Sequence, residues 1–292
     1  MNAAIRENVP MSRFTSWRVG GCARRLFEPE DRHALVQMLR SQDPSEQVFY
    51  VGLGSNLLVR DGGIPGTVVL LRKGFSKMER LDARTLRIEA GVACAQIARR
   101  ALQWKLSGAD FFAGIPGTLG GALAMNAGAF GDETWRHVVA IEWISRGGDI
   151  ERVPAGHFNV SYRQVPVPPG QGFLSADLTF EPDPAVTRKG VRELLARRAA
   201  TQPLEHPNSG SVFMNPPGDH AARLIESCGL KGWRMGDAEV SVKHANFIVN
   251  RGQARARDIE ALIRHVHDTV QSKTGIDLVT EVRIIGEPGH DE

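Results

Sequence analysis

The chain has 292 residues, of which 42% are hydrophobic and 24% are charged, as is ordinary for a folded globular protein. This length allows a substantial hydrophobic core and about two domains. The 36 basic and 33 acidic residues leave a net charge of +3, which is too balanced to indicate a nucleic-acid partner.

The cysteines and the first residues of the chain indicate its compartment. Cys22, Cys94 and Cys228 lie far apart with no paired spacing, so we expect neither a disulfide framework nor a zinc site. The first residues, MNAAIRENVPMSRF, lack the apolar core of a signal peptide, and no apolar run approaches ~20 residues. We therefore expect a cytoplasmic protein that does not bind a membrane.

The N-terminal two-thirds alternates short β-rich runs with two helical periodicities. Each run is bounded by Gly, Pro or Asp, which is typical of strand ends. The two helices show apolar residues that recur on one face. Strands are expected at 47–51, 67–71, 85–90, 138–145 and 173–180, and helices at 31–42 and 93–106.

The composition changes near 165–190, where QVPVPPGQG is typical of a loop and EPDPAVTRKG of a connector. The later residues predict a compact α+β unit. Asp219 is expected to cap a helix that ends at Gly229. His265 and His267 are two residues apart on a helix, so they face different sides and predict no metal pair. Helices are expected at 191–200, 220–228 and 258–272, and strands at 246–250 and 277–286.

A first glycine-rich segment, VGLGSNLLVRDGGIPG (51–66), follows the strand predicted at 47–51. A glycine turn after a strand is typical of phosphate binding, because unshielded N–H groups can converge there on an anion. Gly52 and Gly54 fit the start of the dinucleotide fingerprint, but Leu57 stands where its third glycine belongs. The segment also lacks the lysine of a P-loop. The sequence therefore predicts neither a Rossmann fold nor a P-loop fold.

A second glycine-rich segment, GIPGTLGGALAMNAGAFG (114–131), carries no charge and mixes glycine with apolar residues. Two such segments indicate a ligand that has both a pyrophosphate and a large flat ring system, and FAD fits that description. The alternative is that both are tight turns around buried strands, and glycine content alone does not decide between them.

Seven ordered motifs carry a resemblance to a known family. They are GLGSNLLVRDGGIPGTVV, the second glycine-rich segment, SYR (161–163), NSGSVFMNP (208–216), AARLIESCGLKG (221–232), HANFIVN (244–250) and TEVRIIG (280–286). In this order the sequence resembles the UDP-N-acetylenolpyruvoylglucosamine reductase family, in the form that lacks an extra tyrosine-bearing loop. The resemblance runs from residue 12 to Gly286.

The resemblance implies an α+β protein with an FAD-binding domain of the vanillyl-alcohol-oxidase type. That domain is expected in two subdomains, 1–72 and 73–185, followed by a C-terminal α+β substrate-binding domain at 186–292. FAD is expected to be bound noncovalently. The implied cofactor-binding residues are Gly52, Gly54, Ser55, Asn56, Ile115, Pro116, Gly117, Thr118, Gly120, Gly121, Asn126, Ala127 and Gly128.

The implied reaction passes a hydride from NADPH through FAD to a UDP-sugar enolpyruvyl ether, in peptidoglycan precursor synthesis. Negative charge then builds up on the carboxylate of the substrate, so the site needs a cation and oriented donors, together with a proton donor. No nucleic acid, membrane or metal is expected as a partner, and a monomer is expected.

Matching the motifs residue by residue assigns three catalytic residues. Arg163 falls on the arginine that stabilises the enolate, Ser211 on the serine that delivers the proton, and Glu281 on the glutamate that assists at the carboxylate. Tyr162 and Asn215 fall on substrate contacts. Without the resemblance, Arg163 would be read as a surface salt-bridging residue, Ser211 as a turn hydroxyl and Glu281 as a solvent-facing strand residue.

The sequence departs from the family pattern at four positions. Ser209 stands where alanine or cysteine is usual, and Met214 stands where a basic residue is usual. Asp237 replaces a glycine, and Val242 replaces a polar residue. These changes bear on affinity for the anionic substrate more than on the fold.

Two rival functions are left open. One is a flavin-dependent oxidase of the same superfamily, acting on an alcohol or a lactone. Such oxidases often tether the flavin through a histidine in the first glycine loop, whereas GLGSN contains neither His nor Cys. The other is a catalytically silent flavin-binding protein, which an intact set of Arg163, Ser211 and Glu281 argues against.

Overall fold

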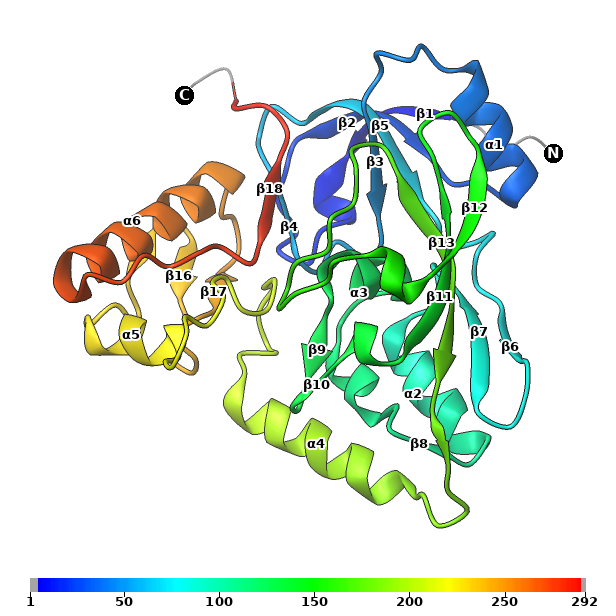
Figure 1. Cartoon of the computed structure of the whole chain (residues 1–292). Coiled ribbons are helices and arrows are strands. Elements are labelled where there is room, and N and C mark those ends of the chain that lie inside the picture. The colour runs from blue at the N-terminus through cyan, green and yellow to red at the C-terminus, as the bar shows by residue number, and fades with distance from the viewer. Residues whose placement is uncertain (1–4, 290–292) are drawn as a thin grey trace. The chain divides into compact units, whose positions relative to one another are not determined.

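The computed structural model describes residues 5–289, which divide into two units (Figure 1). The first unit contains Arg25–Leu53 and Gly66–Arg197, together with residues up to Glu7. The second contains Asn8–Arg24, Gly54–Pro65 and the chain from Arg198 onward. The chain therefore changes unit between Leu53 and Gly54, inside the first glycine-rich segment.

An antiparallel five-stranded sheet forms the main part of the first unit, in the order β12-β11-β13-β7-β6. Its central strand β13 is buried along almost its whole length, because α2 and α3 cover the apolar face with side chains such as Ile97 and Leu119. The strands predicted at 85–90, 138–145 and 173–180 and the helix at 93–106 are confirmed. The elements are β6 (Met78–Arg80), β7 (Thr85–Glu89), α2 (Cys94–Gln103), α3 (Leu119–Met125), β11 (Val138–Ile144), β12 (Ile150–Pro154) and β13 (Gly172–Thr179).

A four-stranded sheet has the order β1-β2-β5-β3, with β3 parallel to β5. Helix α1 buries Leu35, Met38 and Leu39, and the Asp31 carboxylate caps it by accepting the N–H of Ala34 at 2.8 Å. The strands predicted at 47–51 and 67–71 and the helix at 31–42 are confirmed. The elements are β1 (Arg6–Pro10), β2 (Cys22–Phe27), α1 (Arg32–Ser41), β3 (Val48–Val51) and β5 (Ile64–Leu70).

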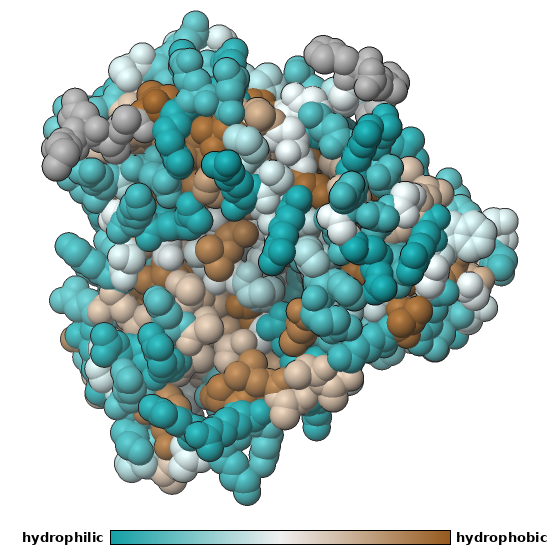
Figure 2. All heavy atoms as spheres, turned by 180° about the vertical axis from the view of Figure 1, so that it is seen from behind, coloured by the Kyte–Doolittle hydropathy of each residue, from teal (hydrophilic) through white to brown (hydrophobic). Residues whose placement is uncertain are grey.

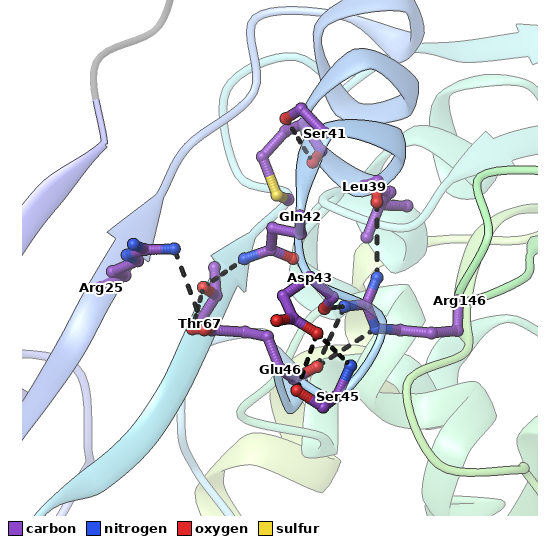
Figure 3. Close-up of polar contacts among 10 residues, drawn as sticks. Arg25, Leu39, Ser41, Gln42, Asp43, Ser45, Glu46, Thr67 and Arg146 are labelled. Carbon is purple, nitrogen blue, oxygen red and sulfur yellow. Dashed lines mark hydrogen bonds and ion pairs between the residues drawn. The ribbon is translucent and has the colours of Figure 1, made fainter.

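β3 ends at Val51, where the first glycine-rich segment begins, and Arg146 binds the turn between α1 and β3 (Figure 3). Its guanidinium donates to the carbonyl oxygens of Leu39 (3.4 Å), Asp43 (2.7 Å) and Glu46 (3.2 Å). The Thr67 hydroxyl donates to the Glu46 carboxylate at 3.1 Å. The Leu39 carbonyl belongs to the last turn of α1, where carbonyls lack helical partners, and the other bonds tie the residues between α1 and β3 to neighbouring segments of the first unit.

The second unit packs helices α5 and α6 with a small antiparallel sheet in the order β15-β16-β17. Helix α6 buries Ile259, Leu262 and Val266 and ends at Gly275, which has a φ of +74°. The predicted helices and the strand at 246–250 are confirmed. The elements are α5 (Ala221–Ser227), β15 (Arg234–Met235), β16 (Ala238–Val240), β17 (Ile248–Asn250) and α6 (Ala256–Thr274).

The last strand differs from the prediction in length. β18 covers Arg283–Ile285 and pairs in parallel with β4 (Leu57–Val59), whereas a strand was expected over 277–286. The residues before it make only an isolated bridge, between Thr280 and Phe213. The remaining elements are α4 (Arg188–Thr201), β8 (Leu106–Ser107), β9 (Gly128–Ala129), β10 (Asp132–Glu133) and β14 (Glu181–Pro182), together with four short 3₁₀ turns.

The surface drawn in Figure 2 is mostly hydrophilic, with hydrophobic residues in small groups. Exposed large hydrophobic side chains include Tyr162, Trp233 and Val242, which are 47%, 48% and 64% exposed. Within residues 5–289, none of the helices has the length and apolar character that crossing a bilayer requires.

Candidate active site

The first glycine-rich segment is shaped by the backbone of the protein itself. Gly54 has a φ of +62°, and a Cβ added there would lie 1.9 Å from the carbonyl oxygen of Phe14. The carbonyl of Gly54 accepts the N–H of Ser16 at 3.1 Å. Only glycine therefore fits this position, whether or not a ligand is present.

The second glycine-rich segment turns into helix α3 beside Gly52. A Cβ added at Gly52 would lie 2.6 Å from Oγ1 of Thr118, so the two segments meet at this point in the first unit. Gly120 donates its N–H to Ala90 at 2.8 Å, and its Cα packs against that residue. A Cβ at Gly121 would meet only Oγ1 of Thr118, at 3.9 Å. The space beside the backbone of Gly121 is therefore not filled by the protein, and a large bound group could occupy it.

The predicted catalytic arginine and two residues that follow α3 are non-glycine residues with left-handed backbone. The φ angles of Asn126, Phe130 and Arg163 are +42°, +57° and +59°. The Arg163 guanidinium donates to the carbonyl oxygens of Asn126 and Gly128, each at 3.0 Å, and stacks over the Tyr162 ring at 5.0 Å. Such backbone is uncommon outside glycine and persists only where surrounding contacts hold it. Backbone carbonyls of the fold therefore hold the Arg163 guanidinium, which differs from the simple surface ion pair that the sequence alone would suggest.

The buried side-chain amide of Asn126 makes a hydrogen bond at each end, and these bonds help to hold its left-handed backbone. Its Oδ1 accepts the N–H of Trp135 at 3.1 Å, and its Nδ2 donates to the carbonyl of Ser161 at 3.2 Å. It therefore links the end of α3 to the residues just before Tyr162 and Arg163. The contact of Asn126 with a cofactor stays a prediction.

Ser211 and Glu281 lie on two neighbouring extended segments of the second unit. The N–H of Glu281 donates to the carbonyl of Val212 at 2.8 Å, and the N–H of Met214 donates to that of Val279 at 2.9 Å. Ser211 and Glu281 are both partly buried. The structure therefore brings together two residues that are seventy positions apart in the chain.

Asn246, from the HANF motif, holds the Ser211 segment from its other side. Its Oδ1 accepts the N–H of Phe213 at 2.9 Å, its Nδ2 donates to the carbonyl of Phe213 at 2.8 Å, and its own carbonyl accepts the N–H of Val212. Asn246 was assigned no role from its motif. The available signal was an asparagine directly before the apolar run FIV, and the structure places it in the turn before β17.

The second half of the first glycine loop joins the same hydrogen-bonded set. Asn56 donates its Nδ2 to the carbonyl of Glu281 at 2.9 Å, and its own carbonyl accepts the N–H of Arg283 at 3.1 Å. The Ser209 hydroxyl donates to the carbonyl of Ser55 at 2.8 Å. Residues 55 and 56 are therefore fixed to the segments that carry Ser211 and Glu281.

Asn215 caps helix α5, a position that the sequence analysis gave to Asp219. Its Oδ1 accepts the N–H of Ala221 at 3.1 Å. The Asp219 carboxylate instead binds the N–H of His220 and the guanidinium of Arg223, and these bonds, that of Arg223 foremost, lower the pKa of Asp219 to about 2. The Asp219 prediction was therefore wrong, and a substrate contact by Asn215 stays a prediction.

Two residues of the first glycine-rich segment have a role that sequence reasoning missed. The Asp61 carboxylate accepts the N–H groups of Ala256 and Arg257, at 3.1 and 2.9 Å, and so caps α6. Arg60 binds the Glu260 carboxylate through two hydrogen bonds, at 2.9 and 3.0 Å. No local pattern indicates either contact, because the partners lie about two hundred residues further along the chain.

The two histidines of α6 have separate environments. His265 stacks on Trp233 at 4.8 Å, whereas His267 contacts Asp268 and Asp277, whose hydrogen bonds raise its pKa. Within the part of the chain that the structure describes, no three His, Cys, Asp or Glu side chains are grouped so as to hold a metal ion.

Two family models match the chain. One, described as the C-terminal domain of UDP-N-acetylenolpyruvoylglucosamine reductase, matches residues 202–285, and the other, an FAD binding domain, matches residues 23–154. Proteins named UDP-N-acetylenolpyruvoylglucosamine reductase are similar over nearly the whole chain. That of Alkalilimnicola ehrlichii is 52% identical over 97% of this chain and 95% of its own length, and that of Methylococcus capsulatus is 53% identical over 96% and 93%.

The fold is also similar to a solved structure. The crystal structure of UDP-N-acetylenolpyruvylglucosamine reductase (MurB) from Thermus caldophilus matches with a TM-score of 0.82 and 33% identity. The match covers 97% of this chain and 100% of that one.

Proposed function

The chain belongs to the UDP-N-acetylenolpyruvoylglucosamine reductase family, and from that premise we propose how its residues carry out the reaction. It is an FAD-dependent oxidoreductase of peptidoglycan synthesis that reduces UDP-N-acetylenolpyruvoylglucosamine to UDP-N-acetylmuramate. NADPH is the hydride donor.

The bare backbone at Gly121 supports the fit of FAD to this chain. Apart from its chain neighbours and the backbone of α3 itself, only Thr118 Oγ1, at 3.9 Å, lies within 4 Å of a Cβ built at Gly121, so a large group can approach the main chain there. We assign the pyrophosphate to residues 52–56 and 115–121, with 126–128 beside it. The chemistry that FAD supplies when bound is hydride transfer, from NADPH and then to the methylene carbon of the enol ether.

Arg163 is assigned to the carboxylate of the substrate. Hydride addition to the methylene carbon places negative charge on the carbons and oxygens that lead to this carboxylate, and a fixed cation lowers the energy of that state. The bonds from Arg163 to the carbonyls of Asn126 and Gly128 support the assignment, because they fix the guanidinium before the substrate arrives. Tyr162, under the same guanidinium, is assigned to substrate contact.

Ser211 is assigned as the donor of the proton to the carbon next to the reduced one, which becomes the lactyl stereocentre. The proton that Ser211 loses is replaced from solvent. Glu281 is assigned to charge handling at the same carboxylate, and Asn215 to substrate contact. The observation that carries this proposal is the direct bond between the Ser211 and Glu281 segments, from Glu281 N–H to the Val212 carbonyl at 2.8 Å.

Four finer points belong to the same proposal. We propose that FAD is held noncovalently, because GLGSN offers no His or Cys for a tether. We propose a cytoplasmic monomer. We also keep the boundaries at 72/73 and 185/186, which separate the two FAD-binding subdomains from a substrate-binding domain at 186–292.

Anaerobic sequential mixing tests the function. NADPH should bleach the flavin absorbance of the yellow protein, and the enolpyruvyl sugar nucleotide should then restore it. A flavin that an alcohol or a lactone reduces, or that stays on the protein after acid treatment, would favour an oxidase instead. A flavin that neither NADPH nor an alcohol reduces would indicate a silent binding protein.

A further inference from the structure

Two side chains tie the second half of the first glycine loop to the segments that carry Ser211 and Glu281. Asn56 donates its Nδ2 to the carbonyl of Glu281 at 2.9 Å, and Ser209 donates its hydroxyl to the carbonyl of Ser55 at 2.8 Å. Both bonds lie within the second unit. Neither donor contacts Ser211 directly, so each can act on it only through the backbone.

The bonds continue without a gap from the loop to the Ser211 segment. After Asn56 the chain enters β4, which pairs in parallel with β18, and Arg283 N–H binds the carbonyl of Asn56 at 3.1 Å. The residues before β18 include Glu281, whose N–H binds the carbonyl of Val212. A displacement of Asn56 is therefore transmitted to the residue that follows Ser211 through two hydrogen bonds and one short stretch of extended chain.

Ser209 supplies the second bond of this connection. The residue is buried, at 4% exposed. A buried hydroxyl needs a partner, and the carbonyl of Ser55 is that partner here. The hydroxyl therefore closes a second bond between the loop and the turn that leads to Ser211.

We propose that Asn56 and Ser209 are positioning residues, which couple occupation of the first glycine loop by FAD to the placement of Ser211 and Glu281. The inference depends on the proposed function only for the identity of the proton donor. In this proposal the side-chain amide of Asn56 binds the Glu281 carbonyl rather than FAD. FAD is then bound by the backbone N–H groups of residues 54–56. Because proton delivery is sensitive to displacements of about 1 Å, the two bonds matter for the step that uses Ser211.

Hydrogen–deuterium exchange of the apoprotein with and without FAD tests the coupling directly. In the unsubstituted protein, FAD should slow exchange in peptides that cover 209–214 and 279–283. In Ser209→Ala, FAD should still bind with a Kd within about threefold, but this protection should be lost or strongly reduced, and Asn56→Asp, measured at saturating FAD, should lose it as well. Equal protection in all three proteins would overturn the proposal, and so would a large loss of FAD affinity in Ser209→Ala.

The two half-reactions give the second readout. Reduction by NADPH should stay within about threefold in Ser209→Ala, whereas reoxidation by the enolpyruvyl sugar nucleotide should slow about tenfold or more in both variants. Ser209→Thr keeps a hydroxyl and should recover the rate. Ser227→Ala is the matched control, since its hydroxyl binds the carbonyl of Leu224 at 2.8 Å within α5, away from the loop.

Other outcomes separate the possible failures. A lower thermal midpoint with unchanged rates in both half-reactions would mean that the two bonds only stabilise the fold, and would overturn the proposal. Failure of the unsubstituted protein to react with the enolpyruvyl sugar nucleotide would instead defeat the proposed function. The hydrogen–deuterium exchange experiment uses FAD alone. It therefore still tests the coupling between FAD and the Ser211 segment when the sugar nucleotide does not react.

Discussion

The two glycine-rich segments look alike in sequence but owe their glycines to different causes. In the segment at 51–66, a Cβ at Gly54, Gly62, Gly63 or Gly66 would lie between 1.9 and 2.3 Å from a backbone oxygen of the protein. In the segment at 114–131, a Cβ at Gly128 would likewise lie 2.3 Å from the carbonyl oxygen of Asp132, but one at Gly121 would meet only one atom, at 3.9 Å, and one at Gly131 would meet none within 4 Å.

The difference separates two readings that glycine content alone leaves open. Most glycines of the first segment are needed because strands and turns of the protein pack directly against their backbone. This agrees with the alternative that the segment is a set of tight turns. The second segment also has glycines packed on the protein, but Gly121 is bare where the protein leaves room. The strongest structural support for a ligand therefore comes from one glycine rather than from the number of glycines.

The largest effect on stability is expected for Gly54→Ala. The new methyl group would overlap the carbonyl of Phe14, and the φ of +62° is unfavourable for alanine, so the free energy of unfolding should fall by about 3 kcal/mol or more. Urea denaturation of the apoprotein measures this change. A loss below ~1 kcal/mol would show that the loop relaxes easily and would remove the contrast between the segments.

Gly121→Ala should separate stability from cofactor binding. Gly121 lies in the first turn of α3, where alanine is the better helix former, so the apoprotein should gain ~0.5–1 kcal/mol of stability. The methyl group would also occupy space that we assign to FAD, and the Kd for FAD should rise about tenfold, or ~1.4 kcal/mol. Titration of the apoprotein with FAD is the measurement, and unchanged affinity would place the cofactor elsewhere.

Gly131→Ala isolates the backbone contribution from the steric one. Gly131 has a φ of +90° but no neighbour within 4 Å of an added Cβ, so only the unfavourable backbone is introduced. We expect a loss of about 1 kcal/mol in the free energy of unfolding, clearly less than for Gly54→Ala. A loss equal to that of Gly54→Ala would mean that steric overlap is not what distinguishes the first segment.

The smallest effect is expected at Asp110, in the 3₁₀ turn that leads into the second segment. Partial burial raises the pKa of Asp110, so the folded state favours the protonated form and the charged form destabilises the fold above that pKa. Asp110→Asn should therefore raise the urea midpoint slightly at pH 7. The gain should shrink as the pH falls toward the ordinary pKa of an aspartate, and a gain independent of pH would contradict this cause.

Much of the fold was predictable because the signals are local. The apolar face of α1, the five β-rich runs of the N-terminal region and the glycine that ends α6 all depend on residues close in sequence. The strand expected at 277–286 was too long because alternation of residues does not reveal where a pairing partner ends. β18 pairs only over Arg283–Ile285, since β4 is itself only Leu57–Val59.

The motifs proposed residues for the site but not the contacts that hold them. Ordered motifs assigned Arg163, Ser211 and Glu281 as catalytic, and these assignments stay predictions, whereas no spacing indicated that Asn56 binds Glu281 or that Asp61 caps α6. Those contacts join residues about two hundred positions apart. The choice of Asp219 over Asn215 as a cap failed for a related reason: Arg223, one turn further along, draws the Asp219 carboxylate away from the helix N–H groups.

The most direct test of the central claim is a single-turnover comparison of the unsubstituted protein with Ser211→Ala, both loaded with FAD. If Ser211 delivers the proton, NADPH should bleach the flavin at nearly the same rate in both, while the enolpyruvyl sugar nucleotide should restore the absorbance at least about 100-fold more slowly in the variant. Equal slowing of both steps, or normal recovery in the variant, would contradict the account.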